Sequence, residues 1–218
     1  MRPYETRDGV AIVSLRSVPQ FDAWIAELDL ILDDADVRCL LVDGTHCDEA
    51  EPGWDDAACR AWRLWRKPSI CALQGLWGGD RLAFALACDV RVCAPDTEFR
   101  FSPGYRTALL ESLVGSDAAR ELEAGPTMDA DEARRRGLVF AIAGDPVAGA
   151  GRIASVIASR GPLAVQLAKE AVWRGLEMPL EQALRFETDL TLLLQTTKDR
   201  AEGVSAFLQK REPHFTGS

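Results

Sequence analysis

The first hundred residues alternate between short runs of consecutive apolar residues and longer stretches in which apolar residues recur at helical spacing. Each short run is bounded by Asp-Gly or Pro, and the runs are GVAIVSL (9–15), VRCLLVDG (37–44) and SICAL (69–73). Uninterrupted runs of this length are typical of strands buried on both faces. The helical spacing occurs over residues 21–32 and in DDAACRAWRLWR (55–66). Strands that alternate with such helices predict an α/β domain with a largely parallel sheet.

The segment LQGLWGGDRLAFALACDVRV (73–92) indicates a glycine turn, then a buried helix, then a strand. Asp80 follows the Gly78-Gly79 pair, where the helix is expected to begin. The start of a helix concentrates free backbone N–H groups and the positive end of the helix dipole, which together hold negative charge. Asp80 is therefore either an N-cap that accepts from the N–H groups of residues 82–83, or a carboxylate that takes part in chemistry.

The second half of the chain is predominantly helical. The periodicity predicts helices at 106–124, 129–136, 148–160, 162–175, 179–197 and 199–209, interrupted by the short apolar run GLVFAI (137–142). Asp129 and Asp131 are candidate N-caps, and Gly137 is a candidate C-cap. We therefore divide the chain into an α/β core over residues 1–160 and a C-terminal helical region over residues 161–218.

Composition and charge exclude several kinds of partner. Lys and Arg number 25 against 34 Asp and Glu, which gives a formal net charge of −9 and a pI near 4.8. This balance argues against a nucleic-acid partner, which needs a basic face, but it leaves room for a local basic pocket that takes a phosphorylated ligand. No apolar run approaches the roughly 18 residues of a membrane span, and the charged start MRPYETRDGV does not fit a signal peptide.

The cysteines point to a reducing compartment. They are scattered without a C-x-x-C pair, and they are Cys39, Cys47, Cys59, Cys71, Cys88 and Cys93. Several lie inside apolar runs, as small buried hydrophobic residues do. We therefore expect structural free thiols and a cytoplasmic location.

Several common catalytic devices have no support in the sequence. His46 and His214, the only histidines, lie far apart without a nucleophile elbow, and no spacing fits a metal site. The glycines of residues 75–79 do not form G-x-G-x-x-G, and no Walker A sequence occurs. What remains is a pair of strand-to-loop junctions, LLVDGTHCDEAEPGWD (40–55) and SICALQGLWGGD (69–80). Their loops are either two ordinary turns or an oxyanion hole, in which each loop offers one backbone N–H to the same carbonyl oxygen.

From Asp36 to its C-terminus the chain resembles the crotonase family, the enoyl-CoA hydratase/isomerase superfamily. The landmarks occur in family order and are VRCLLVDG, KPSICALQG, ALACDVRVCAPDTEF, MDADEARRRGLV and DRAEGVSAFLQKREPHF. The resemblance implies a crotonase-like spiral of strands and helices with a C-terminal helical trimerisation region, in a homotrimer or hexamer. It also implies an acyl-CoA-type thioester ligand whose carbonyl is polarised by two backbone N–H groups, with no cofactor beyond the CoA of the substrate.

The family's motifs assign both oxyanion donors and both catalytic positions. The A-G-A-D-like loop of the family matches PGWD, in a longer loop, so the resemblance implies that Trp54 supplies the first N–H. The motif N-G-x-x-x-G-G-G-x-E-L-A-x-x-C-D matches QGLWGGDRLAFALACD without a gap, which implies Asp80 as the second donor. Ala83 then replaces the first catalytic glutamate, and Pro103, or Gly104 if the match is shifted by one residue, replaces the second. The glycine-rich stretch that shapes the family's acyl pocket is shortened.

Loss of both glutamates predicts chemistry other than standard hydration, because carboxylates position the water and deliver the proton. Asp80 is the candidate catalytic residue, since a desolvated carboxylate turned into the pocket would shuttle protons. Glu111, with Tyr105 and Arg106, either turns inward beside the shortened segment or lies at the surface. Arg81 is expected to extend its charge to solvent.

Two residues near the C-terminus match the family's CoA-binding end. The resemblance implies that Phe207 stacks near the adenine of a neighbouring subunit's CoA and that Lys210 meets a phosphate. The alternative is a plain amphipathic helix end. Two functions stay open: a crotonase-superfamily enzyme of the lyase or isomerase class, and a non-catalytic accessory or binding subunit.

Overall fold

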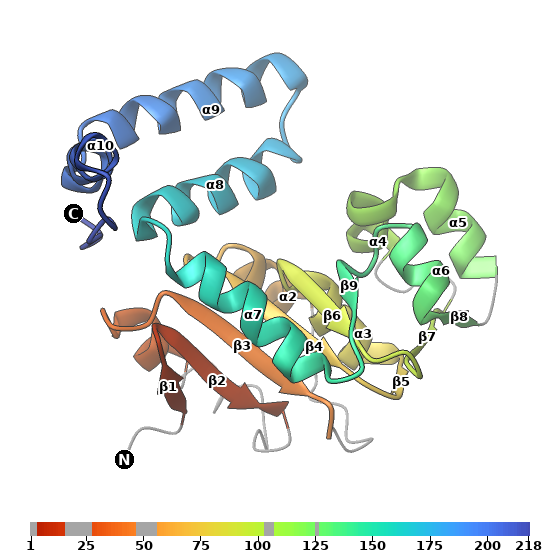
Figure 1. Cartoon of the computed structure of the whole chain (residues 1–218). Helices are drawn as coiled ribbons and strands as arrows, with labels where there is room; N and C mark the ends of the chain where they lie inside the picture. Colours follow the sequence, from red (N-terminus) through yellow and green to blue (C-terminus); the bar gives the residue numbers. More distant parts are fainter. Residues whose placement is uncertain (1–3, 16–27, 47–55, 103–106, 125–126) are drawn as a thin grey trace.

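The computed structural model describes residues 4–15, 28–46, 56–102, 107–124 and 127–218, which form a central sheet with helices on both faces (Figure 1). The strands of the sheet, in spatial order, are β1 (Glu5–Arg7), β2 (Val10–Ser14), β3 (Cys39–Gly44), β4 (Ser69–Leu73), β6 (Val90–Cys93) and β9 (Ala141–Ile142). β1 pairs with β2 antiparallel, and all the other neighbouring pairs are parallel. The predicted α/β class with a largely parallel sheet is confirmed.

A second, smaller sheet lies beyond the carboxyl end of β4. Its strands, in spatial order, are β5 (Leu76–Trp77), β7 (Glu98–Arg100) and β8 (Thr127–Asp129). β5 and β7 are parallel, and β7 and β8 are antiparallel. Strands of two or three residues are too short to show a hydrophobic period, so the sequence pattern did not predict them.

The helices follow the predicted order along the chain. Residues 28–33 are helical, and the later helices are α2 (Asp56–Arg63), α3 (Gly79–Ala87), α4 (Thr107–Val114), α5 (Ser116–Ala124), α6 (Ala130–Arg135), α7 (Pro146–Ala158), α8 (Pro162–Gly175), α9 (Leu180–Gln195) and α10 (Lys198–Gln209). None of the helices in the described ranges has both the length and the apolar character needed to cross a bilayer.

Each buried strand contributes to two cores, because successive side chains point to opposite faces of the sheet. On one face Leu41 and Ile70 pack with Ala150 of α7, whose small side chains bring this helix close to the sheet. On the other face Leu40 packs in a larger core that includes Phe84 of α3. This burial on both faces explains why the strands read as continuous apolar runs rather than alternating patterns.

Glycine and aspartate set the helix ends in the middle of the chain. The predicted helix over 106–124 is two helices, α4 and α5, because Gly115 adopts a φ of +85° between them. Asp129 is the N-cap of α6 and accepts from the Glu132 N–H at 2.8 Å, as predicted. The candidate cap Asp131 is wrong, since it lies within the first turn. Gly137 has a φ of +79° directly after the C-cap, as a helix-ending glycine should.

Helices α8 to α10 project away from the sheet (Figure 1). Helix α8 matches the predicted range 162–175, and it packs against α9 as an antiparallel pair. The C-terminal tail returns to the body, where Arg38 Nη2 donates to the Phe215 carbonyl at 2.7 Å. The predicted division of the chain after residue 160 falls between α7 and α8, and it stays a prediction.

We expect Gly44→Ala to destabilise the fold, because a Cβ there would lie 2.7 Å from the Trp77 ring and 2.9 Å from the Ala72 carbonyl oxygen. Overpacking of a buried site costs about 1–3 kcal/mol of unfolding free energy, which urea denaturation would measure. Gly144→Ala is the matched control, since its Cβ would meet nothing within 4 Å and its φ is not positive. Equal stabilities for the two variants would contradict the proposed close packing.

Candidate functional site

The glycine turn around residues 75–79 lies at the carboxyl ends of the central parallel strands. β3 ends at Gly44 and β4 ends at Leu73, and these two residues are register partners in neighbouring strands. The turn follows directly, with φ values of +73° at Gly75 and +53° at Gly79. Ligands of open α/β sheets bind at this edge. The turn therefore places the first residues of α3 where a ligand would reach them.

Trp77 closes the interior side of this turn. Its ring is fully buried against Gly44, and its Nε1 donates to the Gln74 carbonyl at 3.1 Å. The Arg81 guanidinium lies 5.1 Å from the centre of the Trp77 ring, and its Nη2 donates to the Leu76 carbonyl at 3.2 Å. This hydrogen bond lies at the exposed surface, and the expectation that Arg81 extends its charge to solvent stays a prediction. Its side chain lies back across the turn and holds the turn in place.

Asp80 lies in the first turn of α3 and is half-exposed. The N-cap of this helix is Gly78, whose extended backbone already turns the chain into the helix, and it makes no side-chain cap bond. The N-cap interpretation of Asp80 is therefore wrong. The residue occupies a helical position at the positive end of the dipole, where a carboxylate is stabilised.

Ala83 lies in a fully buried apolar stretch of α3. It is 1% exposed, within the run from Leu82 to Ala87 that is entirely buried. Its neighbour Phe84 packs against Trp62 of α2 at a centroid distance of 5.1 Å. The helix face that would carry the family's first glutamate is thus an apolar core surface.

Several predicted site residues fall outside the described ranges. They are Trp54, Pro103, Gly104, Tyr105 and Arg106. The first oxyanion donor and the replacement of the second glutamate therefore stay predictions. Glu111 lies in α4 and is half-exposed.

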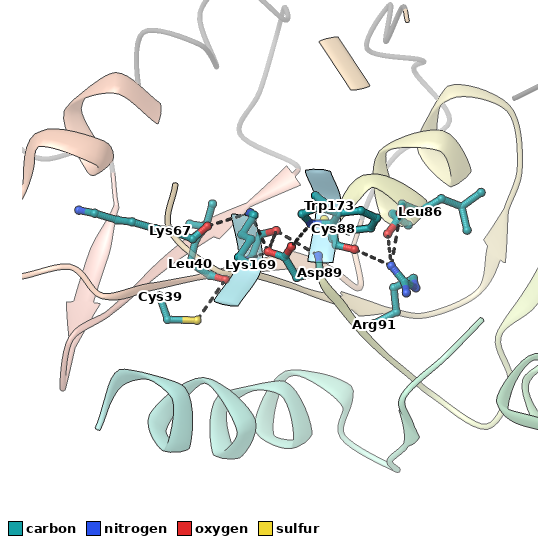
Figure 2. Close-up of polar contacts among 11 residues, drawn as sticks. Cys39, Leu40, Lys67, Leu86, Cys88, Asp89, Arg91, Lys169 and Trp173 are labelled. Atoms are coloured by element: carbon teal, nitrogen blue, oxygen red, sulfur yellow. Dashed lines mark hydrogen bonds and ion pairs between the residues drawn. The ribbon is translucent and has the colours of Figure 1, made fainter. Parts of the chain in front are cut away.

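The Asp89 carboxylate connects a strand to a helix, a role that its place in the family landmark ALACDVRVCAPDTEF did not reveal. Its Oδ2 accepts from the Ser69 N–H at 2.7 Å, from the Ser69 hydroxyl at 2.9 Å and from Lys169 Nζ at 2.8 Å. Its Oδ1 accepts from Trp173 Nε1 at 2.7 Å (Figure 2). The carboxylate therefore joins the start of β4 to α8. An aspartate between a buried helix and a buried strand is the signal that could have predicted this role, because a carboxylate there needs partners.

Arg91 is a second buried charge, at the other end of α3. Its Nη1 donates to the Cys88 carbonyl at 2.5 Å (Figure 2). Its Nε donates to the Leu138 carbonyl at 2.5 Å. Burial lowers its pKa. The guanidinium satisfies carbonyls at the C-terminal end of the helix, where the dipole favours a cation.

The cysteines do not supply a nucleophile in the described part of the chain. Five are buried and form no disulfide among the described residues, and Cys47 lies outside the described ranges. Burial raises the pKa of the Cys39 thiol to about 12, with a further contribution from Asp89, and burial raises that of Cys93 to about 11. Both stay protonated near neutral pH, and the thiolate is the reactive form. No group of three His, Cys, Asp or Glu residues suited to a metal ion occurs among the described residues.

Phe207 and Lys210 lie far from Asp80 in the same chain. Phe207 is 83% exposed on α10, and Lys210 is the C-cap of that helix in the left-handed conformation. Figure 1 shows α10 at the end of the projecting helices, away from α3. One copy of the chain does not bring these residues together with the glycine turn.

Comparison with known proteins identifies the sequence family. The family model described as Enoyl-CoA hydratase/isomerase matches residues 53–218. The chain is 38% identical to a probable mitochondrial enoyl-CoA hydratase 2 of Arabidopsis thaliana, over 69% of this chain and 54% of that protein. It is 35% identical to the 2,3-dehydroadipyl-CoA hydratase of Escherichia coli, over 71% of this chain and 65% of that protein. The matches to these curated relatives span about half to two thirds of their length.

Solved structures confirm the crotonase-like fold that the sequence landmarks implied. An enoyl-CoA hydratase from Bacillus anthracis superposes with a TM-score of 0.81 and 29% identity, over 96% of each chain. A putative enoyl-CoA hydratase from Streptomyces coelicolor superposes with a TM-score of 0.82 and 31% identity, over 99% of this chain and 94% of that chain.

We expect Asp89→Asn to lower the unfolding free energy by about 2–4 kcal/mol, because an amide cannot accept all the donors or balance Lys169. Urea denaturation followed by tryptophan fluorescence would measure the change. Asp96→Asn is the control at an exposed carboxylate, with an expected change within about 0.5 kcal/mol. A loss at residue 89 no larger than that of the control would show that the junction is unimportant.

Proposed function

The chain belongs to the enoyl-CoA hydratase/isomerase family, and we propose that it binds an acyl-CoA-type thioester at the carboxyl ends of β3 and β4. The observation that carries the proposal is the first turn of α3 beside the glycine turn, at this edge of the sheet. N–H groups in the first turn of a helix point toward its amino end, where the dipole is positive, so this end of α3 suits an oxygen that gains negative charge. The Asp80 N–H and the predicted Trp54 N–H would polarise the thioester carbonyl together.

In the proposed reaction Asp80 is the proton acceptor and donor. Its carboxylate takes a proton from the carbon next to the thioester carbonyl, and the electron pair of that C–H bond moves to the carbonyl oxygen as an enolate. Return of the proton at another carbon gives an isomerisation, and expulsion of a leaving group gives a lyase reaction. Standard hydration is not proposed, since Ala83 supplies no second carboxylate. The thioester contributes its own CoA, and no further cofactor is proposed.

A non-catalytic accessory subunit is the second candidate. The burial of Ala83 in an apolar helix face favours it, because this side of the site carries no acid. Both candidates predict a family-type ligand, and they differ in whether Asp80 moves a proton.

We also propose that the protein works in a reducing, cytoplasmic location. We further propose a homotrimer or hexamer whose subunits meet through α8 to α10. Large apolar side chains are exposed on these helices, and they include Leu176, Leu180, Leu184, Leu192, Leu193, Val204, Phe207 and Leu208. A hollow of about 410 Å³ with a mostly apolar lining lies between α8 and α10, and Val204, Phe207 and Leu208 are among the residues that line it. A second copy would cover this surface, and it would bring its own Phe207 and Lys210 toward the glycine turn of its neighbour.

We expect acyl-CoA binding to change tryptophan fluorescence, because the chain has six tryptophans and Trp77 closes the proposed site. Titration with crotonyl-CoA would measure the affinity, and exchange of the α-protons of butyryl-CoA in D₂O would report enolate formation by NMR. Asp80→Asn should keep the affinity and slow the exchange by about 10²–10⁴-fold. Asp96→Asn, an exposed carboxylate near Gln74, is the control.

The outcomes separate the two candidates. No response at millimolar crotonyl-CoA would remove the thioester function altogether. Binding without exchange in the unaltered protein would favour the accessory subunit, and full exchange in Asp80→Asn would refute the acid–base role of Asp80.

We expect the chain to sediment as a trimer or hexamer, and Leu208→Asp to dissociate it, because a charge would enter the apolar hollow. Ala201→Asp, on the same helix but outside the hollow, should leave the assembly intact. A monomer at micromolar concentration would contradict the proposed assembly.

Lys210→Ala should weaken crotonyl-CoA binding about tenfold, because Lys210 is proposed to meet a phosphate of the CoA.

A further inference from the structure

A groove lies between the C-terminal end of α2 and helix α8, and it is called the basic groove here. Its two walls carry Arg63, Trp65 and Arg66 on the first side and Lys169, Trp173 and Arg174 on the second. It encloses about 310 Å³. The α2 wall precedes the start of β4, and the α8 wall binds Asp89 just before β6. The groove therefore lies at the amino ends of the strands, opposite to the glycine turn and Asp80.

The charges of the basic groove contrast with those of the whole chain. Four cationic side chains and one carboxylate, Glu170, line it, while the chain carries a formal charge of −9. Two of the cations are already paired, Lys169 with Asp89 at 2.8 Å and Arg174 with Glu170 at 3.0 Å. Arg63 and Arg66 make no ion pair within the part of the chain that the structure describes. A positive cleft in an acidic protein concentrates anions at one place.

Two aromatic rings of the basic groove contact its cations. The Arg63 guanidinium lies 4.0 Å from the centre of the Trp173 ring, a cation–π contact that orients the arginine. The Lys169 Nζ lies 5.9 Å from the centre of the ring of Trp65, which is 9% exposed. One cation on each wall of the groove is therefore held against a ring of the other wall.

A second hollow continues from the first. It shares Arg66, Leu163 and Gln166 with the basic groove and encloses about 440 Å³. Arg38 and Lys67 line it, and both already donate to backbone carbonyls. Arg66 at the junction is exposed and stands between the two hollows.

We propose that the basic groove binds a small anion that carries phosphate groups, at a site separate from the thioester site. Arg63 and Arg66 present planar forks that match phosphate oxygens, and the cations of the facing wall add to the field. A multiply charged phosphate matches the several cations better than a single carboxylate does. The second hollow gives room for the rest of the ligand beyond its phosphates.

Inorganic pyrophosphate is the probe, titrated calorimetrically into the full chain at constant ionic strength. Arg66→Ala should weaken its binding about tenfold, because a charge-assisted bidentate contact is lost and no described partner is disturbed. Arg60→Ala is the matched control, since Arg60 is an exposed arginine of the preceding helix α2 that does not line the groove. The crotonyl-CoA titration of Arg66→Ala should equal that of the unaltered chain.

Three results would overturn the proposal. They are an absence of pyrophosphate binding to the unaltered chain, an equal loss of affinity in Arg66→Ala and Arg60→Ala, and a matching loss of crotonyl-CoA affinity in Arg66→Ala. The last result would make the basic groove a part of the thioester site. Failure of the thioester function alone would leave the pyrophosphate result unaffected, because the two titrations use different probes.

Discussion

The carboxylate of Asp89 is the interaction on which the arrangement of this molecule depends. It accepts from two groups of Ser69, from Lys169 and from Trp173, so one side chain joins the start of β4 to helix α8. Partial burial of a carboxylate costs folding free energy unless its oxygens accept hydrogen bonds. Here donors from β4 and from α8 supply those hydrogen bonds. Lys169 also donates to the Lys67 carbonyl at 3.0 Å, which adds a backbone contact to the same joint. The position of the projecting helices, and of any surface they offer to a second copy, follows from this joint.

The two ends of the parallel strands carry different groups. At the amino ends of the strands, Asp89 and its partners fix α8, and the basic groove lies beside them. At the carboxyl ends, Gly44 lets the buried Trp77 ring close the turn that leads into α3. Helix α3 runs between the two ends, with Arg91 satisfying carbonyls at its C-terminal end and Asp80 in its first turn. Both charges complement the helix dipole, which suits a helix buried along most of its length.

The sequence predicted the central elements well because a strand buried on both faces appears in the sequence as a continuous apolar run. β3 and β4 are continuous apolar runs, since both faces are covered, and α8 begins and ends where the periodicity placed it. The pattern did not predict the break at Gly115, because a glycine within a helical period is also compatible with an unbroken helix. It also misplaced the start of α3, since Gly78 supplies the extended cap conformation two residues earlier than a capping Asp80 would need. The role of Asp89 depends on partners distant in sequence, which no local pattern contains.

The proposed chemistry has to use a carboxylate at the positive end of a helix. If the Asp80 carboxylate stayed charged, it would compete with the enolate oxygen for the positive end of the α3 dipole. That competition would argue against a base at this position. The carboxylate does not stay charged, however, because the proton it accepts neutralises it as the enolate forms. The negative charge then moves from the Asp80 carboxylate to the thioester oxygen while both lie near the same helix end, so the total charge there is unchanged. The helix dipole stabilises the starting carboxylate and the enolate alike. The proposed oxyanion N–H groups would then be the part of the site that favours the enolate over the carboxylate, because they would point at the oxygen where charge develops. Since Ala83 lies in a buried apolar face and brings no second acid, proton transfer in the proposed reaction rests on that single exchange of charge.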